Sequence, residues 1–542
     1  MSGKPLAVYV SPGLSPWLDD FPAEVLALNP EPGIYDLPAA LAERGVTPDL
    51  ILQDETLVPR TLLKGLESFD CPKIFWSLDP HLNHYWQAPY CALFDAVAVT
   101  QKDWIEPLRR AGVARVEWIT WCAENAPWVP FAARPHLAAF VGRTTAFRPL
   151  RRFFVDYLTS RFPLRVETDI PHDHVQAVYT TARLAPNESI QGEITERLFT
   201  AAGAGCLVFE PRSDNALEEL FEPGREVLTY ADALELNAIM ERFVERPAEA
   251  ERLGRAAWER VAREHRPRHR VQALAHLALG SQASAPRGAA GERLFWLGAA
   301  HCLEANRLAV PLEQVIQGLE EYQEDPDCLT AILRLLVMGG QAREALAVAM
   351  RYAAAGFAPA SASFMICACA LALRLEEFSL AQRLYEAFAT ASGDPLRQVA
   401  GPAGLYAALA ESLARREELQ RPGFPFEQDV HLPATASEMY RMSLSLDPDN
   451  QSVLRKAEAL LRDLPGSEVQ RLGLLSELSL RKGEDYRLGL ALGLADLKAF
   501  RVIQGLEEVR LARLQARARG KGQAFERLLA ARDSRGHIRA VL

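Results

Sequence analysis

Long hydrophobic runs are absent from this sequence of 542 residues. No apolar stretch approaches the roughly 18 residues that a membrane-spanning helix needs. The opening segment, MSGKPLAVYVSPG, has one Lys and then a short apolar run that ends in Pro and Gly, whereas a signal peptide has a longer apolar core. We therefore predict a cytoplasmic protein without a transmembrane segment.

Cysteine pairs at the spacing of a metal or redox site are also absent. The eight cysteines are scattered, none forms a CxxC pair, and several lie within apolar runs. This distribution argues against a zinc site and against a disulfide framework. We predict buried, reduced thiols.

An excess of positive charge is lacking, because the formal net charge is -10. This argues against a general electrostatic attraction to nucleic acid or to an anionic membrane, so no nucleic-acid partner is predicted. Local basic clusters, such as Arg151 with Arg152 and residues 263–270, are candidate anion sites, with solvated helix faces as the alternative. The remaining composition, 49% hydrophobic and 24% charged, is that of a folded chain, and the length predicts three or four domains.

The first half of the chain alternates short apolar runs with amphipathic stretches, a pattern typical of parallel α/β sheets. One series of predicted strands covers 5–11, 49–54, 73–78, 96–100 and 115–121. A second series covers 136–143, 163–168, 175–181, 206–211 and 226–230. We therefore predict an α/β fold with two Rossmann-like lobes, joined by the proline-rich segment 124–135.

The architecture is predicted to change after residue 278. Residues 279–291, LGSQASAPRGAAG, concentrate Gly, Ala, Ser and Pro without periodicity and are a candidate linker. From residue 292 onward, helical Leu and Ala periodicity replaces the strand-like runs. The predicted domains are one lobe at 1–135, a second lobe at 136–278 and an all-α domain at 292–542, which makes two separable halves.

Internal similarity within the last domain indicates a helical repeat. Segments 341–356 and 377–393 align at a spacing of about 36 residues, and 436–450 ends in Asp-Pro-Asp-Asn, like the exit turn of a tetratricopeptide repeat. We predict stacked helical hairpins of tetratricopeptide type, with an irregular helical bundle as the alternative. Concave surfaces of such arrays bind extended chains, so a protein or glycan acceptor is the predicted partner.

A polar loop precedes a predicted helix in the second lobe. The loop contains Asn187 and Glu193, and the helix TERLFTAAGAG leads at once into an apolar strand. We predict that the helix begins near Thr195, where free N–H groups and the positive dipole end suit a diphosphate. Arg197, in the first turn, is predicted to add a bidentate phosphate contact. If Arg197 faces a cleft, its replacement should hardly change the stability of the unliganded protein.

Here the sequence resembles the CgeB-type, or spore-maturation-like, bacterial glycosyltransferases of the GT-B fold. The second-lobe pattern of that family is met at Asn187, Arg197, Phe199, Ala201, Gly205 and residues 219–226. The first-lobe pattern is met at Trp76, Asp79, Pro80, Phe94, Asp95 and Gly112. The likeness covers about residues 1–275.

The resemblance implies a hexosyltransferase-like enzyme that uses a nucleotide diphosphate sugar as donor, with UDP-sugars among the candidates, and needs no essential metal or other cofactor. Arg143 or Arg148 is a candidate to assist Arg197 from the opposite loop. One position departs from the family, because Thr200 stands where a Glu is associated with the nucleotide ribose. Glu196, four residues earlier on the same helical face, is either its substitute or an ordinary acid of a first turn.

A second polar cluster follows the predicted strand 73–78 in the first lobe. Asp79, His81, Asn83 and His84 lie where ligands bind in α/β sheets. Asp79 or His81 is a candidate general base for an acceptor hydroxyl, with a hydrogen-bonded loop as the alternative. The His-Asp-His run at 172–174 is not predicted to bind a metal, because adjacent turn residues rarely converge on one ion.

Two functions are therefore open. The first is sugar transfer, with catalytic candidates Asp79, His81 and Glu196 and with donor-binding candidates Arg143, Arg148, Asn187, Glu193, Thr195, Arg197 and Thr200. The second is a catalytically degenerate scaffold whose repeats bind a protein. Thr200 favours the scaffold, whereas Asn187, Arg197 and Gly205 favour the enzyme.

Overall fold

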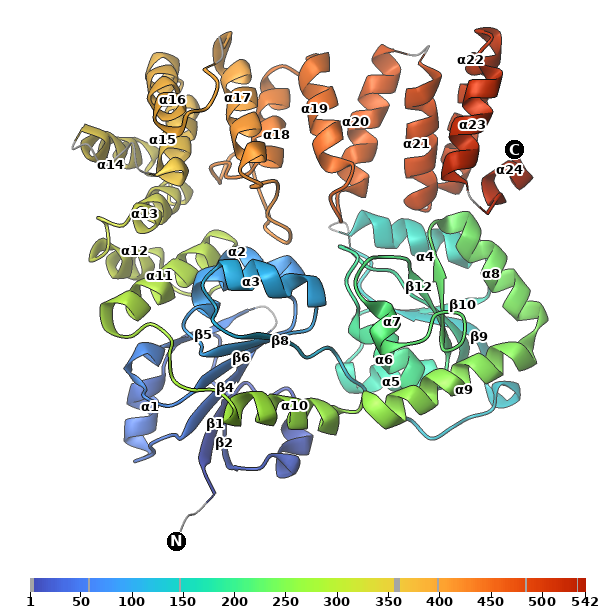
Figure 1. The fold of residues 1–542 in the computed structure, drawn as a ribbon, viewed down its shortest axis with the longest axis horizontal. Coiled ribbons are helices and arrows are strands. Elements are labelled where there is room, and N and C mark those ends of the chain that lie inside the picture. Colours follow the sequence, from blue (N-terminus) through green and yellow to red (C-terminus); the bar gives the residue numbers. More distant parts are fainter. Residues whose placement is uncertain are drawn as a thin grey trace. The chain divides into compact units, whose positions relative to one another are not determined.

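The computed structural model describes residues 4–56, 59–145, 148–354, 361–396, 399–482, 485–533 and 535–542 (Figure 1). Contacts within the chain divide it into two compact units. The first comprises Met1–Thr120 with Val271–Val453, and the second comprises Trp121–Arg270 with Leu454–Leu542. Each unit therefore joins part of the α/β half to part of the helical half.

The first unit is built on parallel strands. These are β1 Leu6–Val10, β2 Glu24–Leu28, β3 Gly33–Asp36, β4 Leu50–Asp54, β5 Thr61–Lys64, β6 Lys73–Ser77, β7 Ala96–Val99 and β8 Val116–Trp118. Six form one sheet in the order β2-β1-β4-β6-β7-β8, while β3 pairs with β5. All residues of β4, β6 and β7 are buried, as expected for parallel strands covered on both faces. The strand order reverses between β1 and β4, which makes a topological switch point there.

The helices of the first unit come from both halves of the sequence. They are α1 Leu37–Glu43, α2 Pro80–Cys91, α3 Ile105–Arg110, α11 Gly288–Glu304, α12 Leu312–Glu320, α13 Pro326–Met338, α14 Ala342–Ala354, α15 Ala362–Arg374, α16 Phe378–Ser392, α17 Gly401–Arg415 and α18 Ala436–Leu446. Two more, α10 Pro267–Leu279 and α19 Gln451–Leu461, cross the unit boundaries. Helices α15 to α18 stand in a row (Figure 1), in which α15 packs on α16 and α17 on α18.

The second unit has a five-stranded parallel sheet. Its strands are β9 His136–Val141, β10 Leu164–Glu167, β11 Ala182–Pro186, β12 Leu207–Pro211 and β13 Val227–Tyr230, in the order β10-β9-β11-β12-β13. Its helices are α4 Pro149–Arg161, α5 His172–Thr180, α6 Glu196–Gly203, α7 Leu217–Leu220, α8 Ala233–Glu245, α9 Pro247–Glu264, α20 Glu468–Arg481, α21 Tyr486–Lys498, α22 Val502–Ala518, α23 Gly522–Arg532 and α24 His537–Val541. The switch point of this sheet lies between β9 and β11.

These elements confirm the predicted fold class, two parallel α/β lobes followed by a helical region. Nine of the ten predicted strands coincide with observed strands, whereas 175–181 lies mostly in helix α5. Val175, Val178 and Tyr179 follow helical spacing, and burial of Val178 and Tyr179 on one face overrides their β propensity. The strand of this region is β11, which begins where that helix ends.

The segment predicted as a linker lies against the first sheet. The N–H groups of Ser284 and Ala285 both donate to Oδ1 of Asp95, and Oδ2 of Asp95 is 3.2 Å from Nζ of the buried Lys73. Helix α11 then packs on α2, with Gly298 against Tyr90, where an added Cβ would lie 3.0 Å from Cβ of Tyr90. The helical half is thus in close contact with the first lobe, and the predicted domain boundaries stay a prediction.

The second lobe is likewise packed against helices from the end of the chain. Phe500, between α21 and α22, belongs to the core of this lobe, and its ring centroid lies 5.0 Å from that of Phe154 in α4. Tyr157 and Tyr230 pack on the same ring. The tetratricopeptide type of the helical region stays a prediction. Among the described residues, no helix combines the length and the hydropathy needed to cross a membrane.

Candidate active site

The carboxyl ends of β11 and β12 in the second unit carry a buried hydrogen-bond network. Asn187, directly after β11, donates through Nδ2 to Oγ1 of Thr195 and to Oε2 of Glu210, both at 2.7 Å. The main-chain carbonyl of Asn187 accepts a bond of 2.5 Å from the hydroxyl of Tyr230. Asn187 thus joins strands β11, β12 and β13 to the start of α6, at one edge of the sheet.

Arg197 is held by the same network. Its Nε donates to Oδ1 of Asn187 at 2.8 Å, and its Nη2 donates to the carbonyl of Glu188 at 2.5 Å. The Glu188 carboxylate lies 3.9 Å from Nη2 of Arg197 and accepts a 2.7 Å bond from Nε of the buried Arg151. Nη1 of Arg197 lies beside Gly142, where an added Cβ would be 3.4 Å away. The Nε and Nη2 groups of Arg197 therefore hold the loop at Asn187 and Glu188 in place. Its Nη1 is directed toward the chain that follows β9.

Helix α6 begins at Glu196, as predicted, with Thr195 as its N-cap residue. The hydroxyl of Thr195 accepts from Asn187 instead of capping the helix. Glu193 closes the preceding turn, because its carboxylate accepts from the N–H groups of Ile190 and Gln191. Arg197 and Asn187 thus fix the loop from outside while Glu193 fixes it from within.

Thr200 and Glu196, the two candidates for the ribose contact, have different hydrogen-bond partners and different exposure. Oγ1 of Thr200 donates to the carbonyl of Glu196 at 3.2 Å, within the same helix. The Glu196 side chain is 40% exposed and lies 2.9 Å from Nε2 of His172, at the start of α5. Arg143 pairs with Asp169 at 3.1 Å on the surface, and Arg148 precedes α4 as its N-cap residue.

Glu210 is a buried acid that the sequence analysis did not single out. Burial raises the pKa of Glu210 to about 8, and the hydrogen bond from Asn187 opposes this shift only in part. Its Oε1 is buried without a hydrogen-bond partner among the described residues. With a pKa of about 8, Glu210 is mostly protonated at neutral pH, and the single negative charge of Glu188 faces two guanidinium groups, those of Arg151 and Arg197.

In the first unit, Asp54 ends β4 at the switch point. Its carboxylate accepts from the hydroxyl of Tyr9 at 2.7 Å and from the N–H of Gly13 at 2.7 Å. Gly13 approaches so closely that a Cβ there would lie 3.2 Å from Oδ2 of Asp54. Burial raises the pKa of Asp54 to about 7, although both hydrogen bonds act to lower it. This carboxyl can therefore take up or release a proton near neutral pH.

Asp79 belongs to a second acidic cluster beside Asp54. Oε2 of the buried Glu55 accepts from the N–H groups of Leu78 and Asp79, at 2.8 and 2.9 Å. Oε1 of Glu55 accepts from Arg60 at 2.7 Å and from Asn83 at 2.8 Å. Burial, followed by the nearby Asp79 carboxylate, raises the pKa of Glu55 against the attraction of Arg60. Asp79 is the N-cap residue of α2, but its side chain makes no capping bond.

His81 and His84 lie on α2 behind this cluster. His81 is 5% exposed, and its Nδ1 has no hydrogen-bond partner among the described residues. The ring of His84 packs on Trp104 at a centroid distance of 5.0 Å, and burial lowers the pKa of His84 to about 4. Asn83, also on α2, donates to Oε1 of Glu55 and to the carbonyl of Asp79, so its side-chain amide holds Glu55 and the start of the helix in place.

The structure thus gathers the donor candidates Asn187, Glu193, Thr195 and Arg197 at one switch point, and Asp79 and His81 near the other. It also adds three buried acids that sequence reasoning missed: Asp54, Glu55 and Glu210. A signal was present, because each lies in or directly after an apolar strand, where an acid is unusual. No group of three or more His, Cys, Asp or Glu able to hold a metal ion occurs among the residues that the structure describes.

A comparison with known protein families finds a match in the second lobe. Residues 138–276 match the model of a glycosyl transferase-like family. The chain therefore contains a glycosyltransferase-like lobe, and both the Asn187 network and α6 lie within the matched residues. No curated protein matches the chain at a significant level.

Solved structures similar to this chain are distant ones. HepE from Anabaena, solved with UDP and glucose, is 12% identical with a TM-score of 0.38, over 51% of this chain and 100% of that one. Sucrose-phosphate synthase from Thermosynechococcus elongatus is 16% identical with a TM-score of 0.34, over 45% of this chain and 75% of that one. TM-scores this low support no argument about function. The evidence for a transferase is therefore the family match over residues 138–276.

Proposed function

We propose that this protein transfers a sugar from a nucleotide diphosphate sugar to a protein or glycan acceptor. The observation that carries the proposal is the network of Asn187, Arg197 and Glu188 at the switch point of the glycosyltransferase-like lobe. This network presents the first turn of α6 and Nη1 of Arg197 on the ligand-binding edge of the sheet. A diphosphate bound there gains the helix dipole and a charge-assisted hydrogen bond.

The donor residues divide by what they contact. Arg197 binds the diphosphate through Nη1, and Arg143 and Arg148 add positive charge from the chain after β9. Asn187, Glu193 and Thr195 are positioning residues, because their polar atoms are bonded within the loop. Glu196 and Thr200 are the residues proposed for the ribose, and Glu196 is the better candidate because its carboxylate is partly exposed.

The acceptor chemistry is assigned to the first unit. A sugar-transfer reaction needs a base that removes the proton of the acceptor hydroxyl as the new bond forms. Asp79 and His81 remain candidates, and Asp54 joins them because it ends a strand at the switch point and has a pKa near neutrality. The helical region is proposed to recruit the acceptor.

A catalytically degenerate scaffold is the second candidate function. It is favoured by Thr200, whose hydroxyl is engaged with the Glu196 carbonyl and replaces the acid expected at this position. The two functions differ in one measurable property, since a transferase also hydrolyses its donor slowly in the absence of an acceptor.

The test is hydrolysis of a panel of UDP-, TDP-, GDP- and ADP-sugars by the purified chain, with binding of the same nucleotides followed by calorimetry. We expect one donor class to be bound and hydrolysed, and Arg197→Ala to reduce both. Arg225→Ala, on an exposed turn of the same lobe, is the matched control. Binding without hydrolysis by the wild type favours the scaffold, and no binding of any nucleotide rejects both the donor site and the transferase.

A further inference from the structure

The last helices of the chain carry a local charge opposite to that of the whole protein. From Val509 to Leu542 the sequence has nine Lys and Arg against two Asp and Glu, although the formal net charge of the chain is -10. The inner faces of α22 and α23 are apolar, with Val509, Ala512, Phe525 and Leu529 buried. The basic side chains therefore lie on the outer faces.

Several of these cations are not neutralised within the protein. Arg513 pairs with Glu526 at 2.6 Å, and Arg539 pairs with Asp533 at 3.2 Å. Arg517, Lys521 and Arg527 are exposed, and none of them has an acidic partner among the described residues. We refer to these three residues, with the aliphatic side chains described next, as the C-terminal basic surface.

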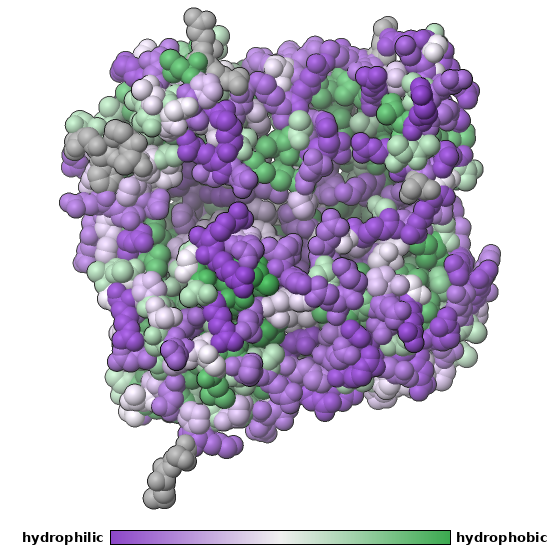
Figure 2. Space-filling model, in the orientation of Figure 1, coloured by the Kyte–Doolittle hydropathy of each residue, from purple (hydrophilic) through white to green (hydrophobic). Residues whose placement is uncertain are grey.

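Exposed aliphatic side chains lie among the cations. On α22, Ile503 is 71% exposed, Leu511 is 50% exposed and Leu514 is 62% exposed, and Leu528 on α23 is 41% exposed. Leu514 is three residues before Arg517 and thus on the same helical face. Figure 2 shows hydrophobic residues in green among hydrophilic ones at the upper right, over the end of the helical region. Exposed aliphatic side chains that lie close together among cations are typical of an interaction surface, so we expect a partner here.

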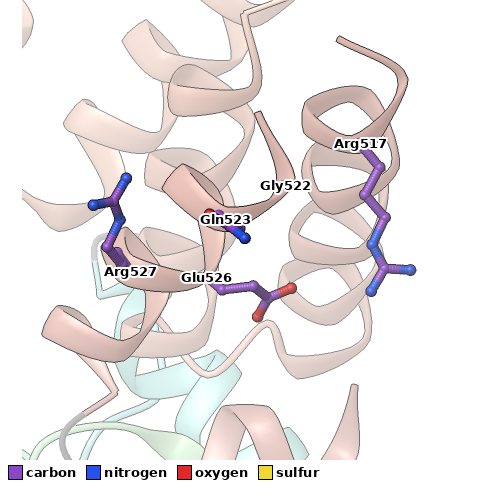
Figure 3. A pocket seen from close by; sticks show the side chains of 5 residues that line it. All are labelled: Arg517, Gly522, Gln523, Glu526 and Arg527. Atoms are coloured by element: carbon purple, nitrogen blue, oxygen red, sulfur yellow. The ribbon is translucent and has the colours of Figure 1, made fainter. Parts of the chain in front are cut away.

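A pocket of about 460 Å³ opens on this surface and is lined by Arg517, Gly522, Gln523, Glu526 and Arg527. Figure 3 shows Glu526 extending from α23 toward α22, the helix that carries Arg517. Because Arg513 neutralises Glu526, the two remaining arginines leave the pocket positively charged. Its volume suits a phosphate-bearing headgroup.

We infer that the C-terminal basic surface docks on an anionic phospholipid bilayer. Basic residues attract the anionic headgroups, and exposed aliphatic side chains enter the interface. Single-stranded nucleic acid fits less well, because proteins that bind it present aromatic side chains on which the bases stack. The one aromatic residue of α22 and α23, Phe525, is fully buried. This docking is independent of the proposed sugar transfer.

The experiment is co-sedimentation of the full chain with vesicles of phosphatidylcholine alone and of phosphatidylcholine mixed with phosphatidylglycerol. We expect binding to the mixed vesicles, weakened by added salt. The triple variant Arg517→Glu, Lys521→Glu, Arg527→Glu should bind at least about 100-fold more weakly, since three attractive charges are replaced by three repulsive ones. Its matched control is Arg343→Glu, Arg351→Glu, Arg383→Glu, the same charge change on exposed positions of α14 and α16, which should bind as the wild type does.

Other outcomes overturn the inference. Equal binding to both vesicle types excludes a role for the cations, and tight binding by the triple variant excludes this surface. Tighter binding to an RNA homopolymer than to mixed vesicles identifies a nucleic-acid site instead. Stabilisation by inorganic phosphate without vesicle binding identifies a free-phosphate pocket. If circular dichroism shows the triple variant unfolded, Leu511→Ser with Leu514→Ser decides, because these exposed side chains should matter for vesicles but not for the fold.

Discussion

Replacement of Arg197 by Ala should destabilise the second unit as well as weaken donor binding. The change removes the 2.8 Å bond to Asn187 and the 2.5 Å bond to the Glu188 carbonyl, and it leaves the buried Glu188 carboxylate with Arg151 alone. Hydrogen bonds from a charged donor contribute about 1.5–3 kcal/mol each, and since these two share one side chain we expect a loss of about 3 kcal/mol in all. For a unit of this size that loss lowers the melting temperature by roughly 6–12 °C.

Thermal melting and calorimetric titration of a nucleoside diphosphate, both on the full chain, measure the two effects separately. Titration is done well below both melting temperatures, where we expect the dissociation constant to rise at least about tenfold. Arg197→Lys should give intermediate values for both, because it keeps the charge but loses the planar fork. Arg225→Ala should change the unfolding free energy by less than about 0.5 kcal/mol, because its ion pair with Glu222 is exposed.

Each possible failure has a distinct meaning. A melting temperature within about 1 °C of the wild type would refute the structural role that the network assigns to Arg197. A normal dissociation constant in a destabilised variant would instead reduce Arg197 to a residue that holds the loop. The sequence alone predicts a change in affinity with no change in stability, whereas the structure predicts that both change. Thermal melting of Arg197→Ala distinguishes the two predictions.

Three further predictions follow from buried groups. Asp54→Asn should gain stability relative to the wild type as the pH rises from about 4 to about 7. The raised pKa keeps folded Asp54 protonated while the unfolded chain is ionised, so wild-type stability falls over that window, which urea unfolding at several pH values measures. Phe500→Ala should cost about 3–5 kcal/mol in urea unfolding, and a loss below about 1 kcal/mol would show that the terminal helices do not complete the second lobe. Glu304→Gln should destabilise the first unit by about 3–5 kcal/mol at neutral pH, because Arg334 then lacks its buried partner. The pKa of Glu304 lies well below its usual range, so this effect should shrink as the pH falls, and a pH-independent difference would contradict the pairing.

Much of the fold could be predicted because parallel strands leave a strong local signal. Apolar runs such as 73–78 and 206–211 are buried on both faces, so composition alone marks them. Strands with mixed burial were missed, as in β2, which has two exposed, two half-buried and one buried residue without strict alternation. Segment 175–181 was assigned wrongly because β-branched residues at helical spacing are compatible with both structures until packing selects one.

The candidate donor site was found in part for a similar reason. Asn187, Thr195 and Arg197 stand in a polar loop before a helix, which is a local pattern. Glu188 and Arg151 are far apart in the sequence, and nothing local predicts that they form the ion pair on which the loop rests. The raised pKa of Asp54 could not be predicted for a similar reason, since burial raises it against the hydrogen bonds from Tyr9 and Gly13, and this environment forms only in the folded protein.

Local patterns in the chain thus decided most of the strands and helices and the approximate start of α6, because hydrophobic periodicity and helix-start signals act over a few residues. Tertiary packing alone decided how the helical half is shared between two units. Phe500 completes the core of the second lobe and α11 covers α2, although more than a hundred residues separate each pair. Such contacts are non-directional burial of apolar surface, so a leucine-rich helix does not specify its partner. The partner is selected only when the whole chain has folded around it.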